Sequence, residues 1–526
     1  MKKFIELFKS ARDVSTPTVA VRTVDSTSTY ESIVKMLDAA HKADKTYPDA
    51  KSTPLVSWDS IHGLTGKNDR GAEALAEMSK IMGIDLAASA DPSIALNILE
   101  GAAEDVIAFY HNPQLVWEND KKVIQGIMNL RNCYKAGGNM LVLNITPGDV
   151  LPNELQNDVL MLEDEMPTAE ELATIVREAY KFAADNPKYA ACKKGPTQQV
   201  IDACVKALIG LPAFPAEQAA NMELNKLTGE MDITGLWNRK RSIIGQMPGL
   251  SFHMGSEKLK DMAGNAAFTK FGIRLMSGKR GANLILRMDE IEKQFGGAST
   301  SEGDGNHKTD LLGEFLSWIE DNKIVCSLLL GVPGSSKSWS TYCIAGEYEI
   351  PCVNYSVSGM QDQFVGNSGK NLRNAQRVAE AMSGKKIWLI ATANSLNGLP
   401  AELISRFSVG GIWFFDVPDD AEKKQIMDLK VAKYHLGKQE YPAMHDWTGR
   451  DIENCAIKAE ALACSLKEAS EFVLPLLRSH NEQMETLRMS AHDRYLSASK
   501  GGAYQYTVAS KAPTKLPETI NGRKMR

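Results

Sequence analysis

The segment Gly331-Val-Pro-Gly-Ser-Ser-Lys-Ser338 has residue types and spacing suited to holding phosphate groups. It follows the apolar run Val325-Cys-Ser-Leu-Leu-Leu330, and its Lys-Ser pair opens a predicted helix. Small residues allow successive backbone N–H groups to point into one cavity, where the helix dipole adds positive charge. Lys337 would then reach the β- and γ-phosphates of a nucleotide, and the Ser338 hydroxyl would ligate Mg²⁺.

The loop departs from the usual P-loop pattern at one position, because Ser336 stands where a second glycine belongs. If that position requires a positive φ, a side chain costs about 1–2 kcal/mol, which leaves weak or slow nucleotide use open as an outcome. The alternative interpretation is a strand-to-helix turn that is merely rich in Gly and Ser. The predicted nucleotide contacts are Gly331, Val332, Pro333, Gly334, Ser335, Ser336, Lys337 and Ser338.

Two later segments extend the pattern. Lys386-Ile-Trp-Leu-Ile-Ala-Thr-Ala-Asn394 is an apolar strand ending in a polar residue, and Leu399-Pro-Ala-Glu-Leu-Ile-Ser-Arg-Phe407 precedes the strand Ile412-Trp-Phe-Phe-Asp-Val417. With the P-loop, these segments resemble the AAA+ ATPases. The resemblance implies that Asn394 positions the attacking water. It also implies that Arg406 is an arginine finger, which places positive charge against the phosphoryl group of a neighbouring subunit.

An acidic pair lies before the P-loop rather than after it. The family carries its Walker B Asp-Glu just before the Asn394-type strand, but here residues 379–384 contain no such strand. Instead, Asn283-Leu-Ile-Leu-Arg-Met-Asp-Glu-Ile-Glu-Lys-Gln-Phe295 closely resembles the Walker B segment. The resemblance implies that Asp289 holds Mg²⁺ and Glu290 orients the nucleophilic water. An ordinary surface pair at a strand end is the alternative, and Arg287 within the strand is unexplained.

This resemblance implies a permuted strand order, with the Walker B strand first, the P-loop strand second and the Asn394 strand third. Such an exchange is physically allowed, because parallel strands joined by helical crossovers can exchange connections and keep their places in the sheet.

Three weaker matches complete the predicted site. Asp362-Gln-Phe-Val-Gly366 resembles the family's pore loop, so Phe364 is the candidate grip on a substrate, with core packing as the alternative. The segment before the Walker B strand resembles the one that packs against adenine, and it contributes Asp261, Met262, Ala263 and Gly264. Arg450 resembles a helix-start residue that touches the γ-phosphate, with a lid-surface ion pair as the alternative.

Short apolar strands alternate with helical stretches, which predicts an α/β fold. The N-terminal half resembles the ATPase-like half, without a working P-loop, of a plastid and cyanobacterial AAA subgroup. Gly63-Leu-Thr-Gly-Lys67 lacks P-loop spacing, and Asn68 replaces the Ser/Thr that Mg²⁺ needs. The predicted domains are a degenerate ATPase-like α/β domain at 1–184, a helical linker at 185–250, an AAA+ core with a parallel sheet at 251–418, a helical lid at 419–482 and a tail at 483–526.

Composition limits the class of protein. The chain has 526 residues with 60 basic and 65 acidic side chains, so its net charge of −5 argues against a broadly cationic nucleic-acid binder. No apolar run approaches the length of a membrane helix, and the eight cysteines are scattered, which is typical of a reducing cytoplasm. The basic cluster Trp237-Asn-Arg-Lys-Arg241 is predicted to be a solvated helix face, with nucleic-acid contact as the alternative.

These features lead to a main hypothesis and two alternatives. The main one is an oligomeric ATPase that uses ATP and Mg²⁺ to remodel an unidentified protein partner, as a homo-oligomeric ring of six that only the resemblance implies. The first alternative is a nucleotide-gated assembly with little hydrolysis. The second, not favoured, is a nucleic-acid motor.

Overall fold

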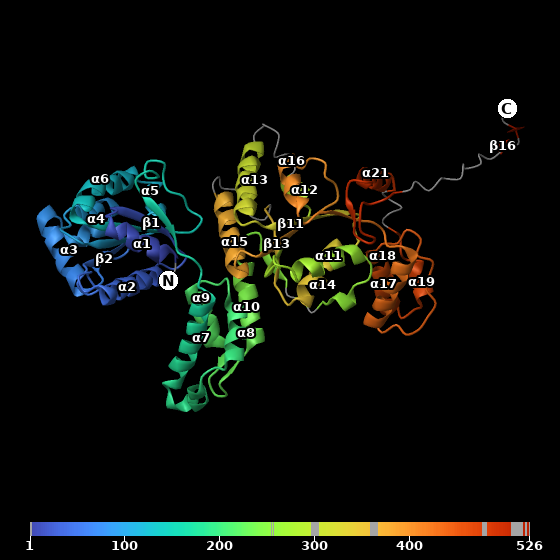
Figure 1. Cartoon of the computed structure of the whole chain (residues 1–526), viewed down its shortest axis with the longest axis horizontal. Coiled ribbons are helices and arrows are strands. Elements are labelled where there is room, and N and C mark those ends of the chain that lie inside the picture. Colours follow the sequence, from blue (N-terminus) through green and yellow to red (C-terminus); the bar gives the residue numbers. More distant parts are fainter. Residues whose placement is uncertain are drawn as a thin grey trace. The chain divides into compact units, whose positions relative to one another are not determined.

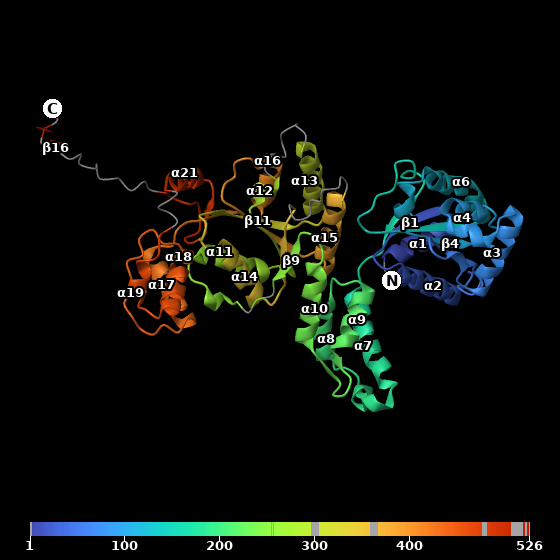
Figure 2. The same ribbon diagram turned by 180° about the vertical axis from the view of Figure 1, so that it is seen from behind.

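The computed structural model describes residues 3–253, 255, 257–295, 304–357, 367–475, 481–506, 519–520 and 523–524. Its contacts divide the chain into two compact units. Unit 1 comprises Met1–Phe252 and Tyr355–Lys385, and unit 2 comprises His253–Asn354 and Lys386–Arg526. Figures 1 and 2 show the elements of both units from opposite sides.

Unit 1 is built on a six-stranded sheet in the order β3-β2-β4-β5-β1-β6. β2 and β3 are antiparallel, and the other neighbouring pairs are parallel. The strands are β1 (Thr18–Arg22), β2 (Leu55–Asp59), β3 (Gly63–Gly66), β4 (Ile107–His111), β5 (Met140–Ile145) and β6 (Leu160–Glu163). The helices are α1 (Lys3–Asp13), α2 (Ser26–Ala43), α3 (Asp69–Met82), α4 (Pro92–Leu99), α5 (Gln114–Trp117) and α6 (Lys121–Gly137).

Alternating side chains of this sheet pack into two separate hydrophobic cores, one on each face. Val19 and Val21 of β1 pack with residues of α1 and α2, whereas Ala20 packs with residues of α3, α4 and α6. This is the alternation that a strand buried on both faces requires, and it explains why these strands are continuously apolar.

A helical bundle completes unit 1, with its own core of Leu172, Val176, Cys204, Leu208 and Leu236. It contains α7 (Ala169–Ala184), α8 (Gln198–Leu208), α9 (Ala213–Glu223), α10 (Ile233–Gly245) and the hairpin β7 (Leu224–Asn225) and β8 (Glu230–Met231). The contacts also group α15 (Asn367–Ser383) with unit 1.

The bundle corrects one expectation. Leu236, Lys240 and Ile244 are all fully buried, and they share one face of α10 because they are spaced four residues apart. Arg239 pairs with Glu223. The basic cluster is therefore not a wholly solvated face, because Lys240 lies on the buried side of the helix.

Unit 2 contains a second parallel sheet, with strands in the order β15-β14-β11-β13-β10-β12. Its strands are β10 (Leu284–Met288), β11 (Val325–Gly331), β12 (Cys352–Tyr355), β13 (Ile387–Ala393), β14 (Ile412–Phe415) and β15 (Leu496–Ser497), and β9 (Leu250–His253) lies at the boundary of the units along the chain. Its helices are α11 (Ala266–Met276), α12 (Ile291–Phe295), α13 (Asp304–Asp321), α14 (Lys337–Glu347), α16 (Ala401–Ser405), α17 (Asp420–Lys433), α18 (Gly449–Leu462), α19 (Leu466–Ser470) and α21 (Asn481–Ala491).

Helices cover both faces of this sheet. Phe268 of α11 and Ile344 of α14 pack against Trp388 and other residues on one face. Figure 1 shows α12 and α13 on the opposite side, where the rings of Phe295 and Phe315 stack with centroids 5.5 Å apart. β10, β11 and β13 are therefore buried inside the unit.

A small group of helices, which we call the lid, follows β14. Met427 of α17, Ile452 and Cys455 of α18 and Leu466 of α19 form its separate core. α18 begins with a capping box between Thr448 and Asp451, both buried, which fixes where its first turn starts. Among the described helices, none is both long and apolar enough to cross a lipid bilayer.

Candidate functional site

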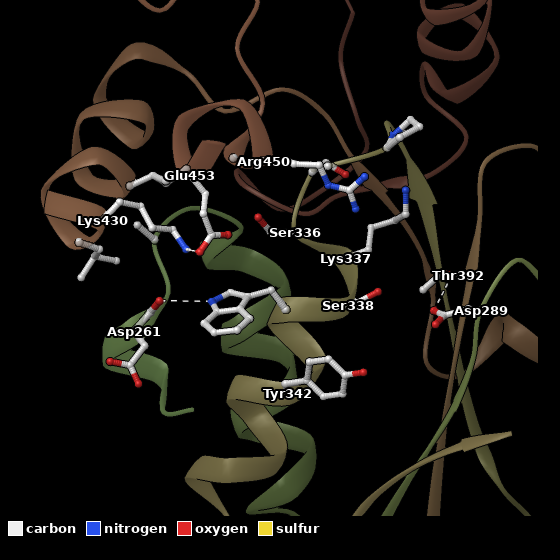
Figure 3. Close-up of a pocket in the computed structure, with 18 of the residues that line it drawn as sticks. Asp261, Asp289, Ser336, Lys337, Ser338, Tyr342, Thr392, Lys430, Arg450 and Glu453 are labelled. Carbon is white, nitrogen blue, oxygen red and sulfur yellow. Dashed lines mark hydrogen bonds and ion pairs between the residues drawn. The ribbon is translucent and has the colours of Figure 1, made fainter. Parts of the chain in front are cut away.

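Unit 2 contains a cavity of about 560 Å³ at the carboxyl ends of β10, β11 and β13, beside α17 and α18 of the lid. The carboxyl edge of a parallel sheet is where α/β folds usually bind ligands. Figure 3 shows side chains of Lys337 and Ser338 on one element and Asp289 on another, around the same space.

The predicted phosphate loop connects β11 to α14 in five residues, 332–336. Gly331 has a φ of 147°, and a Cβ there would meet the Phe415 carbonyl oxygen at 2.1 Å, so the backbone approach requires glycine. Ser336 has a φ of 66° and caps α14 without a side-chain hydrogen bond. Ser336 therefore has the positive φ at which a side chain causes backbone strain.

Lys337 is folded back onto its own loop. Its Nζ donates hydrogen bonds to the carbonyl oxygens of Gly331, at 2.6 Å, and Val332, at 3.0 Å. Burial lowers the pKa of Lys337 to about 8, and Glu292 and Asp289 act in the opposite direction. A buried ammonium held by neutral carbonyls gains from an anionic partner, which a phosphate group would supply.

Asp289 and Glu290 follow β10 directly and line the same cavity. Asp289 Oδ1 accepts a hydrogen bond from Thr392 Oγ1 at 3.1 Å, and the Glu290 backbone N–H donates to the same hydroxyl at 3.2 Å. Thr392 lies on β13, the strand between β10 and β11. It therefore fixes the acidic pair to the middle of the sheet edge.

Arg287, whose presence in an apolar strand the sequence did not explain, is the second partner of Asp289. Only 7% of the residue is exposed, and its Nη2 donates to Asp289 Oδ2. The guanidinium carbon lies 4.5 Å from the ring centroid of Tyr342, which also lines the cavity. Within the described residues, Nε and Nη1 of Arg287 have no hydrogen-bond partner. A charge-assisted pair thus restrains the Asp289 carboxylate.

The far side of the cavity carries aromatic and charged groups. Trp339 Nε1 donates to the Asp261 carbonyl oxygen at 3.2 Å, and Lys430 Nζ lies 5.3 Å from the centroid of the Trp339 ring. Lys430 also pairs with Glu453 at 2.8 Å. Figure 3 shows Asp261, Lys430 and Glu453 together, away from Asp289. An apolar ring beside a backbone carbonyl suits a planar base better than a phosphate.

Most of the residues predicted for the site line this one cavity. They are Asp261, Ala263, Asp289, Glu290, Pro333, Gly334, Ser335, Ser336, Lys337, Ser338, Asn394 and Arg450. The Asn394 backbone N–H donates to Glu292 Oε1 at 3.1 Å. A Cβ on Gly334 would meet Arg450 Cβ at 3.1 Å, so the phosphate loop and the start of α18 are in close contact.

Five predicted residues do not line it. Gly331 and Val332 lie behind the cavity, where their carbonyls hold Lys337. Met262 does not line it either, and Gly264 borders a smaller neighbouring cavity. Arg406 pairs with Glu320 at 2.6 Å. The predicted substrate-gripping Phe364 lies outside the described residues.

Sequence reasoning missed several lining residues, among them Thr392, Trp339, Tyr342, Lys430 and Glu453. Thr392 carried a usable signal, because a lone hydroxyl two residues before Asn394 interrupts an otherwise apolar strand. Trp339 and Tyr342 follow Ser338 on the first turns of α14 and could have been placed by helical spacing. Lys430 and Glu453 come from two lid helices, and their ion pair depends on how these helices pack, which the sequence pattern does not show.

Comparison with known proteins gives distant similarities to AAA domain-containing proteins. An uncharacterized AAA domain-containing protein, ycf46, of Pyropia yezoensis is 21% identical over 221 residues, covering 32% of this chain and 45% of that protein. The ycf46 proteins of Trieres chinensis and Gracilaria tenuistipitata var. liui are 25% and 22% identical over 146 and 191 residues, or 20% and 28% of this chain and 29% and 38% of theirs. No family model matches the chain.

The chain thus spans less than half the length of these curated relatives. The similarities support a relationship with AAA+ ATPases, and the mixed α/β architecture with parallel sheets fits an AAA fold.

The site fits a nucleotide with Mg²⁺ better than a metal ion alone. Among the described residues there is no group of three or more His, Cys, Asp or Glu side chains that could hold a metal. Mg²⁺ is usually bound by one or two protein oxygens together with substrate phosphates and water, which Asp289 and Ser338 beside a phosphate loop could provide. These residue types are therefore suited to holding a metal ion together with phosphate groups.

Proposed function

We propose that this chain is an AAA+ ATPase that binds ATP and Mg²⁺ in the unit 2 cavity and hydrolyses the terminal phosphate. The observation that carries the proposal is the meeting of two segments far apart in the sequence. Lys337 and Ser338, which follow β11, and Asp289 and Glu290, which follow β10, line one cavity on either side of β13.

Each residue has a role that its position supports. The backbone N–H groups before α14 and the Lys337 ammonium bind the phosphates, while Ser338 and Asp289 hold the metal. Bound Mg²⁺ would neutralise charge on the phosphates. Glu290 orients and activates the attacking water, and Asn394, after the central strand, positions it.

We also propose that unit 2 is a permuted AAA+ core in which the Walker B strand precedes the P-loop strand. The support is that β10 comes before β11 in the chain yet occupies a place two strands away from it in the sheet, with β13 between them. The sheet domain of unit 1 is then the degenerate ATPase-like half, because the three residues between β1 and α2 contain no glycine and Ser26, not a lysine, opens α2.

The larger biological role comes from the resemblance, with one supporting observation on Arg406. Arg406 acts as a finger toward the nucleotide of a neighbouring copy, in a ring of six, and Phe364 grips a protein substrate. Arg406 supports this assignment by lying away from its own cavity. The nucleic-acid motor is less well supported, because Lys240 is buried and Arg239 is paired.

The direct test is phosphate release from ATP by the full chain with and without Mg²⁺. Wild-type protein should release phosphate, and Lys337→Ala and Glu290→Gln should reduce the rate to background. Equal rates of phosphate release by wild-type protein and both variants would exclude ATP hydrolysis at this site. ATP binding without wild-type turnover would favour the nucleotide-gated assembly, the alternative that the positive φ of Ser336 supports.

A further inference from the structure

Unit 1 has its own cavity, with a volume of about 490 Å³, at the carboxyl ends of β1, β4 and β5. Thr23 follows β1, Asn112 follows β4, and Asn144 lies near the end of β5. Residues of α15, including Arg377, form another wall. The cavity therefore occupies the sheet edge where parallel α/β folds bind ligands, although the loops there lack a P-loop.

A buried amide inside this cavity lacks a partner. Asn144 is 2% exposed, and its Nδ2 donates a hydrogen bond to His111 Nδ1 at 3.1 Å. His111 Nε2 lies 3.0 Å from Ser57 Oγ, and burial lowers the pKa of His111, which favours the neutral ring that can accept from Asn144. Asn144 Oδ1 is buried and has no hydrogen-bond partner among the described residues.

A buried donor faces the same cavity from α15. Arg377 Nη2 donates to the Asp164 carbonyl oxygen, but Nη1 is buried without a hydrogen-bond partner in the described part of the chain. A buried polar atom without a hydrogen-bond partner destabilises the folded chain, and a ligand that supplies the partner removes that cost. Asn144 and Arg377, which both line this cavity, therefore leave one acceptor and one donor without a partner in the described residues.

The remaining walls argue against a phosphate group. Lys370, the other cation of the cavity, is paired with Asp149 at 2.8 Å. A fully ionised phosphate offers acceptors only and could not satisfy Asn144 Oδ1. Much of the lining is apolar, namely Val24, Pro147, Met166, Pro212, Met247 and Pro248. Apolar walls with a few amides suit an uncharged heterocyclic ring.

We infer that unit 1 binds a neutral heterocycle of nucleobase or nucleoside class, whose ring N–H donates to Asn144 Oδ1 and whose carbonyl or ring nitrogen accepts from Arg377 Nη1. This site is separate from the ATP cavity of unit 2, lies in a unit that has no phosphate loop and needs no hydrolysis. It goes beyond the proposed function and stands if that function fails.

The test is saturation-transfer NMR and equilibrium dialysis of the full chain with free adenosine, guanosine, cytidine and uridine in turn. At least one should bind wild-type protein with a Kd below about 1 mM. Asn144→Leu and Arg377→Met should each weaken that binding at least about tenfold, because each removes one half of the hydrogen-bonding pair. Asn119→Leu, at an exposed asparagine of the same unit, should leave it unchanged.

A second measurement does not depend on variants that fold poorly. Amide hydrogen exchange of wild-type protein with the binding nucleoside should slow in peptides covering 144–148 and 370–378. Two results would overturn the inference. One is the absence of binding by all four nucleosides. The other is binding that both variants retain and excess ADP displaces, because that would place the nucleoside in the unit 2 cavity.

Discussion

The two sheets of this chain have equivalent strand arrangements but different strand connections. Five parallel strands run β6-β1-β5-β4-β2 in unit 1 and β14-β11-β13-β10-β12 in unit 2. Numbered along the chain within each set, these orders read 5-1-4-3-2 and 5-2-4-1-3. The second order results from the first if the third strand along the chain, β4, becomes the first strand along the chain and keeps its place in the sheet. One relocated strand therefore relates the two sheets.

This comparison shows that strand position and strand-end chemistry are separable. In unit 2, Asp289-Glu290 directly follows β10, and five residues connect β11 to α14. In unit 1, β4 ends at His111 and is followed by Asn112, and three residues, 23–25, connect β1 to α2. The same places in the sheet thus carry the proposed phosphate loop with carboxylates in one unit, and amides with an imidazole in the other.

The largest expected effect comes from replacing Lys337 by alanine, with the same change at Lys67 of unit 1 as the control. Lys337→Ala should abolish ATP hydrolysis and weaken ATP binding at least about 100-fold, because it removes the buried cation of the phosphate loop. Lys67→Ala, at the exposed lysine after β3, should change neither. Fluorescent-nucleotide titration and phosphate release measure both. A comparable loss in both variants would break the assigned difference between the units.

The second effect concerns the acidic pair. Glu290→Gln should lower the hydrolysis rate at least about 100-fold while ATP affinity stays within a few-fold, because the amide keeps the size and loses the base. Asp59→Asn, at the end of β2 in unit 1, is the matched control and should leave turnover unchanged. If Glu290→Gln hydrolyses ATP at the wild-type rate, Glu290 has no role in activating water.

The third effect concerns unit 1 and depends on pH. Burial lowers the pKa of Lys240 from 10.5 to about 7. Between these values the unfolded chain binds a proton that the folded unit does not, so the stability of unit 1 rises with pH across this window. Lys240→Met should therefore stabilise unit 1 by about 4 kcal/mol at pH 7 and by little near pH 10.

Urea unfolding followed by hydrogen exchange in α7–α10 measures this change, and Lys206→Met at an exposed position of α8 is the control. A stabilisation by Lys240→Met of the same size at pH 7 and pH 10 would show that packing, and not charge burial, is responsible.

The smallest effect separates strain from function at the phosphate loop. Ser336→Gly should stabilise unit 2 by about 1 kcal/mol, because glycine adopts the φ of 66° without a steric cost. Ser277→Gly, at a helix end with a φ of −82°, should lower stability instead. Thermal unfolding measures both, and faster hydrolysis by Ser336→Gly would indicate that the strain slows turnover. If Ser336→Gly is less stable than wild type, the φ of 66° does not strain the backbone at Ser336.

The sequence predicted the strands and helix start around the candidate site well, because short segments determine these elements. The apolar runs before residues 289, 331 and 394 are strands β10, β11 and β13, and the phosphate-loop spacing predicted the start of α14 at Lys337. It could not predict the return of Lys337 to its own carbonyls, or the contacts of Trp339 with lid residues, because these depend on tertiary packing. The prediction was wrong for Lys240 for the same reason. The charges of the cluster 237–241 indicated a solvated face, but the position of Lys240 on α10 places it on the buried side of the helix.

The most direct test is the structure of the chain with Mn²⁺ in place of Mg²⁺ and a non-hydrolysable ATP analogue, with the ion located by anomalous scattering. The account predicts one ion at the phosphates, contacting the Ser338 hydroxyl, with Asp289 beside it and Glu290 facing the γ-phosphate. An ion bound elsewhere, or an analogue in the cavity with both carboxylates turned away from it, would contradict it.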